Sequence, residues 1–121
     1  MGDNVLKRKS YEFAIRIVKL SQFLQTEKKE YVLSRQILRS GTAIGAIIRE
    51  AEYGQSKLDF INKLSISLKE ANETEYWISL LKDTGYINDQ LYDSLLSDCR
   101  ELMRLLIASI KTAKATIKAV S

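Results

Sequence analysis

The chain has 121 residues, of which 45% are hydrophobic and 28% are charged, and its formal net charge is +4. This balance excludes a disordered chain and is typical of a globular protein with one domain, here spanning residues 1–121. Proline is absent and glycine occurs only five times. Because strands need frequent turns, such long uninterrupted stretches predict an all-α fold.

The composition also restricts the chemistry that the chain can perform. It contains one cysteine, Cys99, and no histidine. A lone cysteine cannot form an internal disulfide, and Ser-His-Asp catalysis, Cys-His catalysis and His-based zinc sites all require histidine. The glycines at 41 and 45 are not followed by the Lys-Ser/Thr pair of a phosphate-binding loop. We therefore predict that the protein is not an enzyme and uses no metal ion or other cofactor.

The same sequence predicts a cytoplasmic location. No segment reaches the roughly 18–20 consecutive apolar residues that a membrane span requires. The N-terminus lacks the basic and then apolar order of a signal peptide. We therefore expect no membrane partner.

Apolar periodicity predicts the first two helices at about residues 10–26 and 31–53. The first has a core stripe spaced by four, three and four residues, made of Phe13, Ile17, Leu20 and Leu24. A polar turn at residues 27–30 separates it from the second. In the second helix Gly41 and Gly45 lie on or beside the apolar face, where small residues allow a neighbouring helix to approach closely.

The third and fourth helices are predicted at about residues 56–84 and 90–120. Ser56 caps the third helix, Gly85 ends it, and Asn88 or Asp89 caps the fourth. Apolar residues recur in the fourth helix at alternating spacings of three and four, and Cys99 lies in this stripe as a small buried residue. Because the connections are short, we predict an antiparallel up-down-up-down four-helix bundle.

Glu75 is the one charged residue in the middle of the apolar face of the third helix. A buried carboxylate needs a partner, because the removal of a lone charge from water is costly. Residue counting from the tight turn near residues 54–55 places Glu75 opposite Arg35, and Glu70 opposite Arg39. We predict these two structural ion pairs, Arg35–Glu75 and Arg39–Glu70, with a catalytic or ligand-binding role as the alternative.

The fourth helix carries a basic stripe. Five cationic residues lie on one face of the helix, within about 40° to either side of Arg100, and span about 27 Å; they are Arg100, Arg104, Lys111, Lys114 and Lys118. A row of this length could follow a phosphate backbone, with mostly phosphate contacts and an auxiliary cluster at Lys7, Arg8 and Lys9. The alternatives are a solvated face that complements the helix dipole, and a protein or membrane contact.

Three apolar residues are candidates for an oligomer interface. Trp77 falls on the polar side of the third helix beside Tyr76, and Ile107 interrupts the basic stripe. An exposed tryptophan in this position indicates a contact between subunits. The alternative for Trp77 is packing against a neighbouring helix of the same bundle.

Several segments together resemble the 23S rRNA intervening-sequence protein family. They are QILRSGTAIGA at residues 36–46, EA at 50–51, KLSISLKEA at 63–71 and ETEYW at 73–77. The chain departs from the family at residues 47–49, where IIR stands in place of an asparagine followed by an apolar residue and alanine. The family is also similar to the helical-bundle accessory proteins of diversity-generating retroelements.

The resemblance implies a bacterial, cytoplasmic four-helix-bundle protein of unknown function that assembles into a homopentamer, with rRNA or another nucleic acid as a suspected partner. From the basic faces and the resemblance together, we expect a non-enzymatic oligomeric bundle that binds structured RNA or other nucleic acid. The alternative is a structural or protein-interaction module with no nucleic-acid role.

Overall fold

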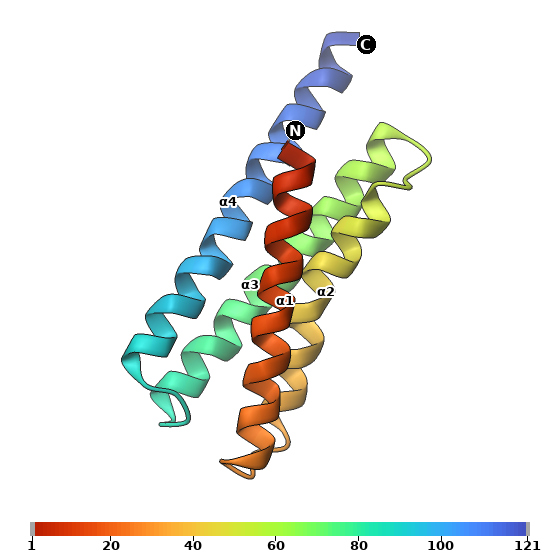
Figure 1. Ribbon diagram of the computed structural model, residues 1–121. Helices are drawn as coiled ribbons and strands as arrows, with labels where there is room; N and C mark the ends of the chain where they lie inside the picture. Colours follow the sequence, from red (N-terminus) through yellow and green to blue (C-terminus); the bar gives the residue numbers. More distant parts are fainter. Residues whose placement is uncertain (1, 121) are drawn as a thin grey trace.

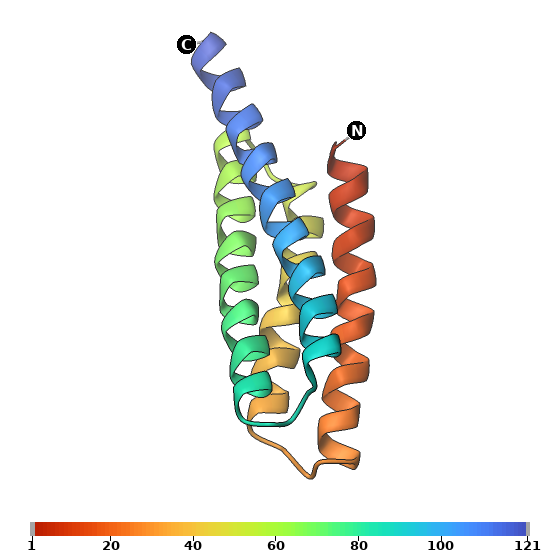
Figure 2. The same cartoon turned by 90° about the vertical axis from the view of Figure 1, so that its left-hand side faces the viewer.

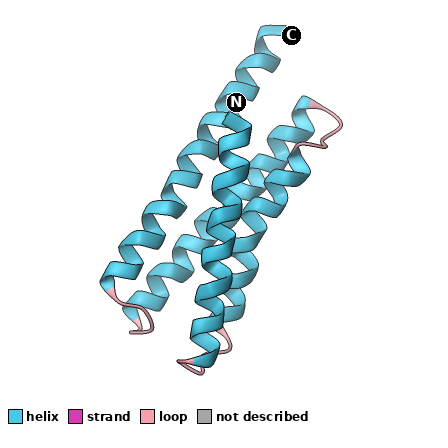
Figure 3. Ribbon diagram, in the orientation of Figure 1, coloured by secondary structure: helices cyan, strands magenta, loops and turns pink. Residues whose placement is uncertain are grey.

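The fold consists of four helices with short connections. A computed structural model describes residues 2–120, with side chains for residues 5–119. The helices are α1 (Gly2–Thr26), α2 (Leu33–Ala51), α3 (Lys57–Asp83) and α4 (Asp89–Val120), and no strand occurs in residues 2–120. Successive helices run up and down in alternation (Figure 1), and only loops join them (Figure 3). The predicted antiparallel four-helix bundle is therefore confirmed.

The helices occupy the corners of a square. Each helix packs against two neighbours, whereas the diagonal pairs α1–α3 and α2–α4 do not come into backbone contact in the described chain. The α1–α4 seam is the sparsest of the four, and two ion pairs cross it, Lys9–Glu101 at 3.2 Å and Arg16–Asp98 at 2.7 Å. Figure 2 shows the bundle turned by 90°. The square arrangement places the α1–α2 face and the α3–α4 face on opposite sides of the molecule.

Side chains and one glycine fix the ends of α3 and α4 where the sequence predicts them. The hydroxyl of Ser56 accepts the backbone N–H of Asp59 at 3.0 Å, and the side-chain carbonyl of Asn88 accepts the N–H of Leu91 at 2.8 Å. Both bonds satisfy N–H groups that have no partner within the helix. Gly85 follows α3 with φ of +84°, a left-handed conformation that glycine adopts without strain.

The start of α1 differs from the prediction by eight residues, since the helix begins at Gly2 and not at Ser10. Leu6 is buried in the core, seven residues before Phe13 on the same face. Ser10 is buried too, and its hydroxyl donates to the backbone carbonyl of Lys7 at 3.0 Å, as a serine inside a helix does. The core stripe of α1 is therefore about two turns longer than expected.

The second helix is shorter than predicted, because it spans Leu33–Ala51 and not residues 31–53. The carboxylate of Glu30 accepts the N–H groups of Val32, Leu33 and Ser34 at 3.2, 3.0 and 2.8 Å. This side chain therefore satisfies the first free N–H groups of α2 and holds residues 31–32 outside the helix.

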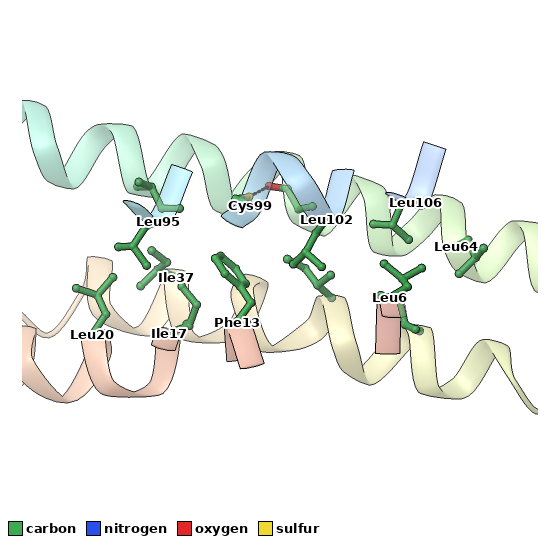
Figure 4. Packing of buried hydrophobic residues seen from close by; sticks show 14 of the residues in the cluster. Leu6, Phe13, Ile17, Leu20, Ile37, Leu64, Leu95, Cys99, Leu102 and Leu106 are labelled. Carbon is green, nitrogen blue, oxygen red and sulfur yellow. Dashed lines mark hydrogen bonds between the residues drawn. The ribbon is translucent and has the colours of Figure 1, made fainter. Parts of the chain in front are cut away.

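All four helices contribute to one hydrophobic core (Figure 4). Phe13, Leu64, Leu102 and Leu106 are at most 2% exposed. Cys99 is fully buried among them, and its thiol donates to the carbonyl of Ala71 at 3.3 Å. Burial raises the pKa of this thiol to about 12, so Cys99 is a protonated core residue, as predicted.

Small residues allow two of the helix seams to close. A Cβ atom placed on Gly41 would lie 2.8 Å from two side-chain carbons of Ile17, and one on Gly45 would lie 3.2 Å from the hydroxyl of Ser10. In the α2–α3 seam, the buried hydroxyl of Thr74 donates to Ser40 at 2.9 Å. The close approach predicted for both glycines is therefore present, and it brings α1 against α2.

Candidate nucleic-acid interface

The second half of α4 carries basic residues and no acidic ones. Beyond Glu101 the sequence contains no acidic residue, and it contains four cationic residues, all exposed: Arg104, Lys111, Lys114 and Lys118. The last turns of α4 extend beyond the start of α1 and beyond the α2–α3 connection (Figures 1 and 2). The basic residues therefore reach into solvent on a helix that is partly free of the bundle.

Arg100, the first residue of the predicted basic stripe, forms an ion pair with a carboxylate. Its Nε and Nη2 atoms donate to the two carboxylate oxygens of Glu75 at 3.2 and 3.4 Å. These bonds raise the pKa of Arg100, which stays charged. Because Glu75 offsets this charge locally, the effective basic row begins at Arg104.

The Arg100–Glu75 pair shows that the predicted Arg35–Glu75 pair is wrong. Glu75 follows Thr74, which faces Ser40 of α2. A step of about 100° around the helix turns the next side chain toward α4. Arg35 is exposed and forms no ion pair among the described side chains. The residue count did not give the direction in which Glu75 points.

The other predicted ion pair is present and belongs to a small surface network. Nη1 of Arg39 lies 3.1 Å from Oε1 of Glu70, and its Nη2 atom contacts Glu73. The indole N–H of Trp77 donates to the same Glu73 oxygen at 3.0 Å. The hydrogen bond from Trp77, together with that from Arg39, lowers the pKa of Glu73. Trp77 is thus tied to neighbours in its own bundle.

Acidification should change the fluorescence of Trp77, the only tryptophan, with a midpoint below the ordinary pKa of glutamate. A lowered pKa in the folded state means that the Glu73 carboxylate stabilises the fold above the pKa of the unfolded chain, and that this stabilisation is lost as the pH falls through the folded-state value. Arg39→Met should raise the midpoint, since it removes one of the two donors. Arg49→Met, at an exposed arginine of the same helix, should leave it unchanged, and an equal shift in both variants would contradict the network.

The three basic residues near the N-terminus point in different directions and pair with three different carboxylates. Because α1 begins at Gly2, residues 7–9 are helical and point to different neighbours. Lys7, Arg8 and Lys9 pair with Glu52, Glu12 and Glu101 at 3.1, 3.4 and 3.2 Å, respectively. Each charge is therefore offset by a carboxylate, and only Lys9 of the three is paired with α4.

Two of the three candidate interface residues share a surface groove between α3 and α4. Tyr76 is 60% exposed and Ile107 is 41% exposed, and both line this groove with Leu68 and Met103. Trp77 is half-buried and packs edge-to-face with the Tyr76 ring, with a centroid distance of 5.0 Å. Tyr76 and Ile107 thus form an apolar surface, while Trp77 packs within the bundle.

A second exposed apolar surface was not anticipated from the sequence. Tyr11, Ile15 and Val18 are 59%, 42% and 39% exposed, on the side of α1 that faces away from the core. Next to them, Ala14 of α1 and Ala46 of α2 line a groove. The sequence does contain a pattern that indicates this surface: Tyr11, Ile15 and Val18 are spaced by four and three residues, which is typical of side chains on one helix face.

The described residues include neither a metal-binding cluster nor a membrane-spanning helix. No group of three or more His, Cys, Asp or Glu side chains is placed to hold a metal ion within the described chain. None of the four helices, over the same residues, has the length and apolar character needed to cross a membrane.

The fold and the exposed basic row define a small antiparallel four-helix-bundle protein whose last helix carries cations and no carboxylate in its second half. Residues 2–108 match the family described as 23S rRNA-intervening sequence protein, and the chain belongs to this family. It is also similar to a crystal structure described as a protein with unknown function from the S23 ribosomal protein family of Bacteroides thetaiotaomicron VPI-5482. The two sequences are 62% identical over 92% of this chain and 99% of that chain, with a TM-score of 0.91. No relative with a curated description matches the sequence.

Proposed function

We propose that the protein is a non-catalytic, cytoplasmic, oligomeric helical bundle that binds structured RNA or another nucleic acid through the second half of α4. The observation that carries this proposal is the row formed by Arg104, Lys111, Lys114 and Lys118, in a segment of the sequence without any acidic side chain. The family description, which refers to 23S rRNA, is consistent with an RNA partner.

The geometry of this row suits a phosphate backbone. At 1.5 Å per residue, the four cations span about 21 Å of α4. Arg104, Lys111 and Lys114 have no carboxylate partner among the described side chains, so their charges are available to an outside anion. Contacts of this kind are made to phosphates and read little sequence. Removal of one such cation should reduce the slope of log K against log salt by about 0.9 for a duplex.

Assembly would strengthen such contacts, and we propose a homopentamer as the oligomer. One chain has a net charge of +4, so five copies carry five times this charge, +20. Several weak sites held together bind a long polyanion more tightly than one site, because each binding event after the first is intramolecular.

The test is binding of a labelled RNA hairpin at salt concentrations from about 50 to about 300 mM, over which phosphate contacts weaken steeply. Affinity should fall steeply with salt for the wild type. The triple variant Lys111→Glu, Lys114→Glu, Lys118→Glu should lose at least about 100-fold in affinity and most of the salt slope.

The matched control is the triple variant Lys19→Glu, Lys28→Glu, Lys69→Glu, which makes the same change in net charge at exposed lysines outside α4. It should retain most of the binding. Equal losses in both variants would show that net charge, and not the α4 row, attracts RNA. Absence of wild-type binding at the lowest salt would refute the proposal.

Binding to another protein is the second candidate function. The observation that favours it is the exposure of apolar side chains on two separate faces, around Ile15 on α1 and around Ile107 on α4. Isolated exposed apolar residues are ordinary on a protein surface, but clustered ones indicate a contact with another protein.

A further inference from the structure

We infer that a groove between the start of α3 and the second half of α4 binds one unpaired nucleotide of the RNA, with its base stacked on Phe60. To the lining of this groove α3 contributes Lys57 and Phe60, and α4 contributes Ala108, Ser109, Thr112 and Thr116. Its volume of about 420 Å³ lies in the range of about 300–1,000 Å³ that is usual for small-molecule sites. The inference rests on the proposed RNA binding and specifies the kind of RNA structure that is recognised.

The groove lies near the start of α1, where α4 extends past that helix. Earlier in α4, Asp98 and Glu101 pair with side chains of α1. Ser109 and Thr112 follow these two residues by eleven positions. Eleven residues make about three turns of an α-helix, so Ser109 and Thr112 continue the same side of α4. No described side chain of α1 lines the groove, which therefore occupies the corner that this part of α1 leaves open at this end of the bundle (Figures 1 and 2).

Phe60 supplies an aromatic ring on which a base can stack. The ring is half-buried, and the ammonium group of Lys57 lies 5.8 Å from its centroid. This distance is close to the limit of about 6 Å for a cation–π contact, and Lys57 has no carboxylate partner among the described side chains. The flexible lysine side chain can therefore turn toward a phosphate and leave the ring to the base. Stacking on aromatic side chains is how proteins bind the bases of single-stranded RNA.

The groove borders the basic row of α4. Ala108, in the lining of the groove, follows Arg104 by four residues and precedes Lys111 by three. Residues at these spacings are neighbours on the surface of a helix, so both cations lie beside the groove. Lys57 adds a third cation from α3. An unpaired nucleotide carries one phosphate before its sugar and one after it, so cations from two helices around an apolar groove complement its charge.

Two hydroxyl groups in the groove are available to the base. The hydroxyl of Thr116 donates to the backbone carbonyl of Thr112 at 3.0 Å, whereas the side-chain hydroxyls of Ser109 and Thr112 form no hydrogen bond with the described residues. A hydroxyl group can both donate and accept a hydrogen bond, so it can pair with the polar edge of any base. We therefore expect the groove to accept an unpaired base with little preference for its identity.

The test compares two RNA hairpins that differ only in whether one nucleotide, labelled as 2-aminopurine, is unpaired or paired. The wild type should bind the hairpin with the unpaired nucleotide about 5- to 100-fold more tightly, the range expected from the stacking of one base on an aromatic ring. The 2-aminopurine fluorescence should fall on binding, because stacking quenches it. Phe60→Leu keeps an apolar side chain but removes the ring, so it should bind both hairpins with the affinity of the wild type for the paired one.

The matched control is Phe23→Leu, which removes a ring in α1, at the other end of the bundle (Figure 1). Phe23 is likewise partly exposed, and the ammonium group of Lys28 lies at the same 5.8 Å from its centroid. This variant should keep the preference for the unpaired nucleotide, and circular dichroism should show equal helix content in both variants. A measurement on the wild type alone complements the variants: 5-iodouridine at the unpaired position should crosslink to Phe60 under ultraviolet light, as mapped by mass spectrometry.

Equal affinity of the wild type for the two hairpins, a preference that survives in Phe60→Leu, or a crosslink outside the groove would overturn the inference. Binding of the paired hairpin depends on the basic row and is measured separately through its salt dependence. Salt-dependent binding without a preference would thus overturn this inference and leave the proposed function in place. Absence of binding to either hairpin would overturn both.

Discussion

Replacement of Phe13 by alanine should lower the free energy of unfolding by about 3–5 kcal/mol, the range observed when a large buried aromatic is truncated. Phe13 is 2% exposed and points from α1 into the core (Figure 4). Its ring fills space that the four helices cannot close without it, so its removal leaves a cavity in addition to the loss of apolar burial. Urea denaturation followed by circular dichroism measures the change.

The matched control is Phe23→Ala, in the same helix at a residue that is 39% exposed, for which we expect a much smaller loss. Labelling of the Cys99 thiol offers an independent readout, because this buried group reacts only when the core opens. The rate of labelling should rise in Phe13→Ala and stay near the wild-type rate in Phe23→Ala. Equal stability of the two variants would contradict the assignment of Phe13 to the core.

Substitution of Gly41 by alanine should also destabilise the fold, by about 1–3 kcal/mol, as expected when extra volume enters a packed core. Helix propensity alone predicts the opposite sign, since alanine favours a helix by about 1 kcal/mol over glycine. We expect the steric cost to exceed the gain in helix propensity, because the new methyl group would lie 2.8 Å from both Cγ1 and Cγ2 of Ile17. Thermal denaturation shows whether the substitution lowers the melting temperature, as the steric contact predicts, or raises it, as helix propensity predicts.

A double-mutant cycle identifies Ile17 as the cause of this effect. Ile17→Ala alone should cost about 2–5 kcal/mol through the cavity that it creates. In that background Gly41→Ala should cost much less than in the wild type, since both clashing carbons have been removed. Additive losses would mean that Gly41 is required for another reason than its contact with Ile17.

The features of the fold that depend on local signals could be predicted from the sequence. Apolar spacing and capping residues gave α3 and α4 within one residue of their observed ends, because Ser56, Gly85 and Asn88 act on the backbone next to them. The Arg39–Glu70 pair followed from the register of a hairpin with a short turn. The start of α1 was misplaced because Leu6 stands alone among polar residues, and only its packing in the bundle shows that it is helical.

The candidate site could be predicted only in part, because the availability of a charge depends on helices that are distant in sequence. Lys7 and Lys9 are cationic residues in the sequence, but their carboxylate partners are Glu52 and Glu101. Arg100 likewise meets Glu75, on a helix face whose direction a residue count does not give. The row from Arg104 onward could be predicted more directly, since the sequence after Glu101 contains no acidic residue.

The sparse α1–α4 seam has a consequence for the order of folding. The other three pairings join consecutive helices, so each hairpin can form as soon as its second helix has been synthesised. Chains dominated by such local contacts fold in microseconds to milliseconds, because little loop entropy is lost before contacts form. The α1–α4 seam joins the two ends of the chain, and we expect it to close last. It is also the most weakly packed seam, so transient opening of the native bundle, and the hydrogen exchange that accompanies it, starts there.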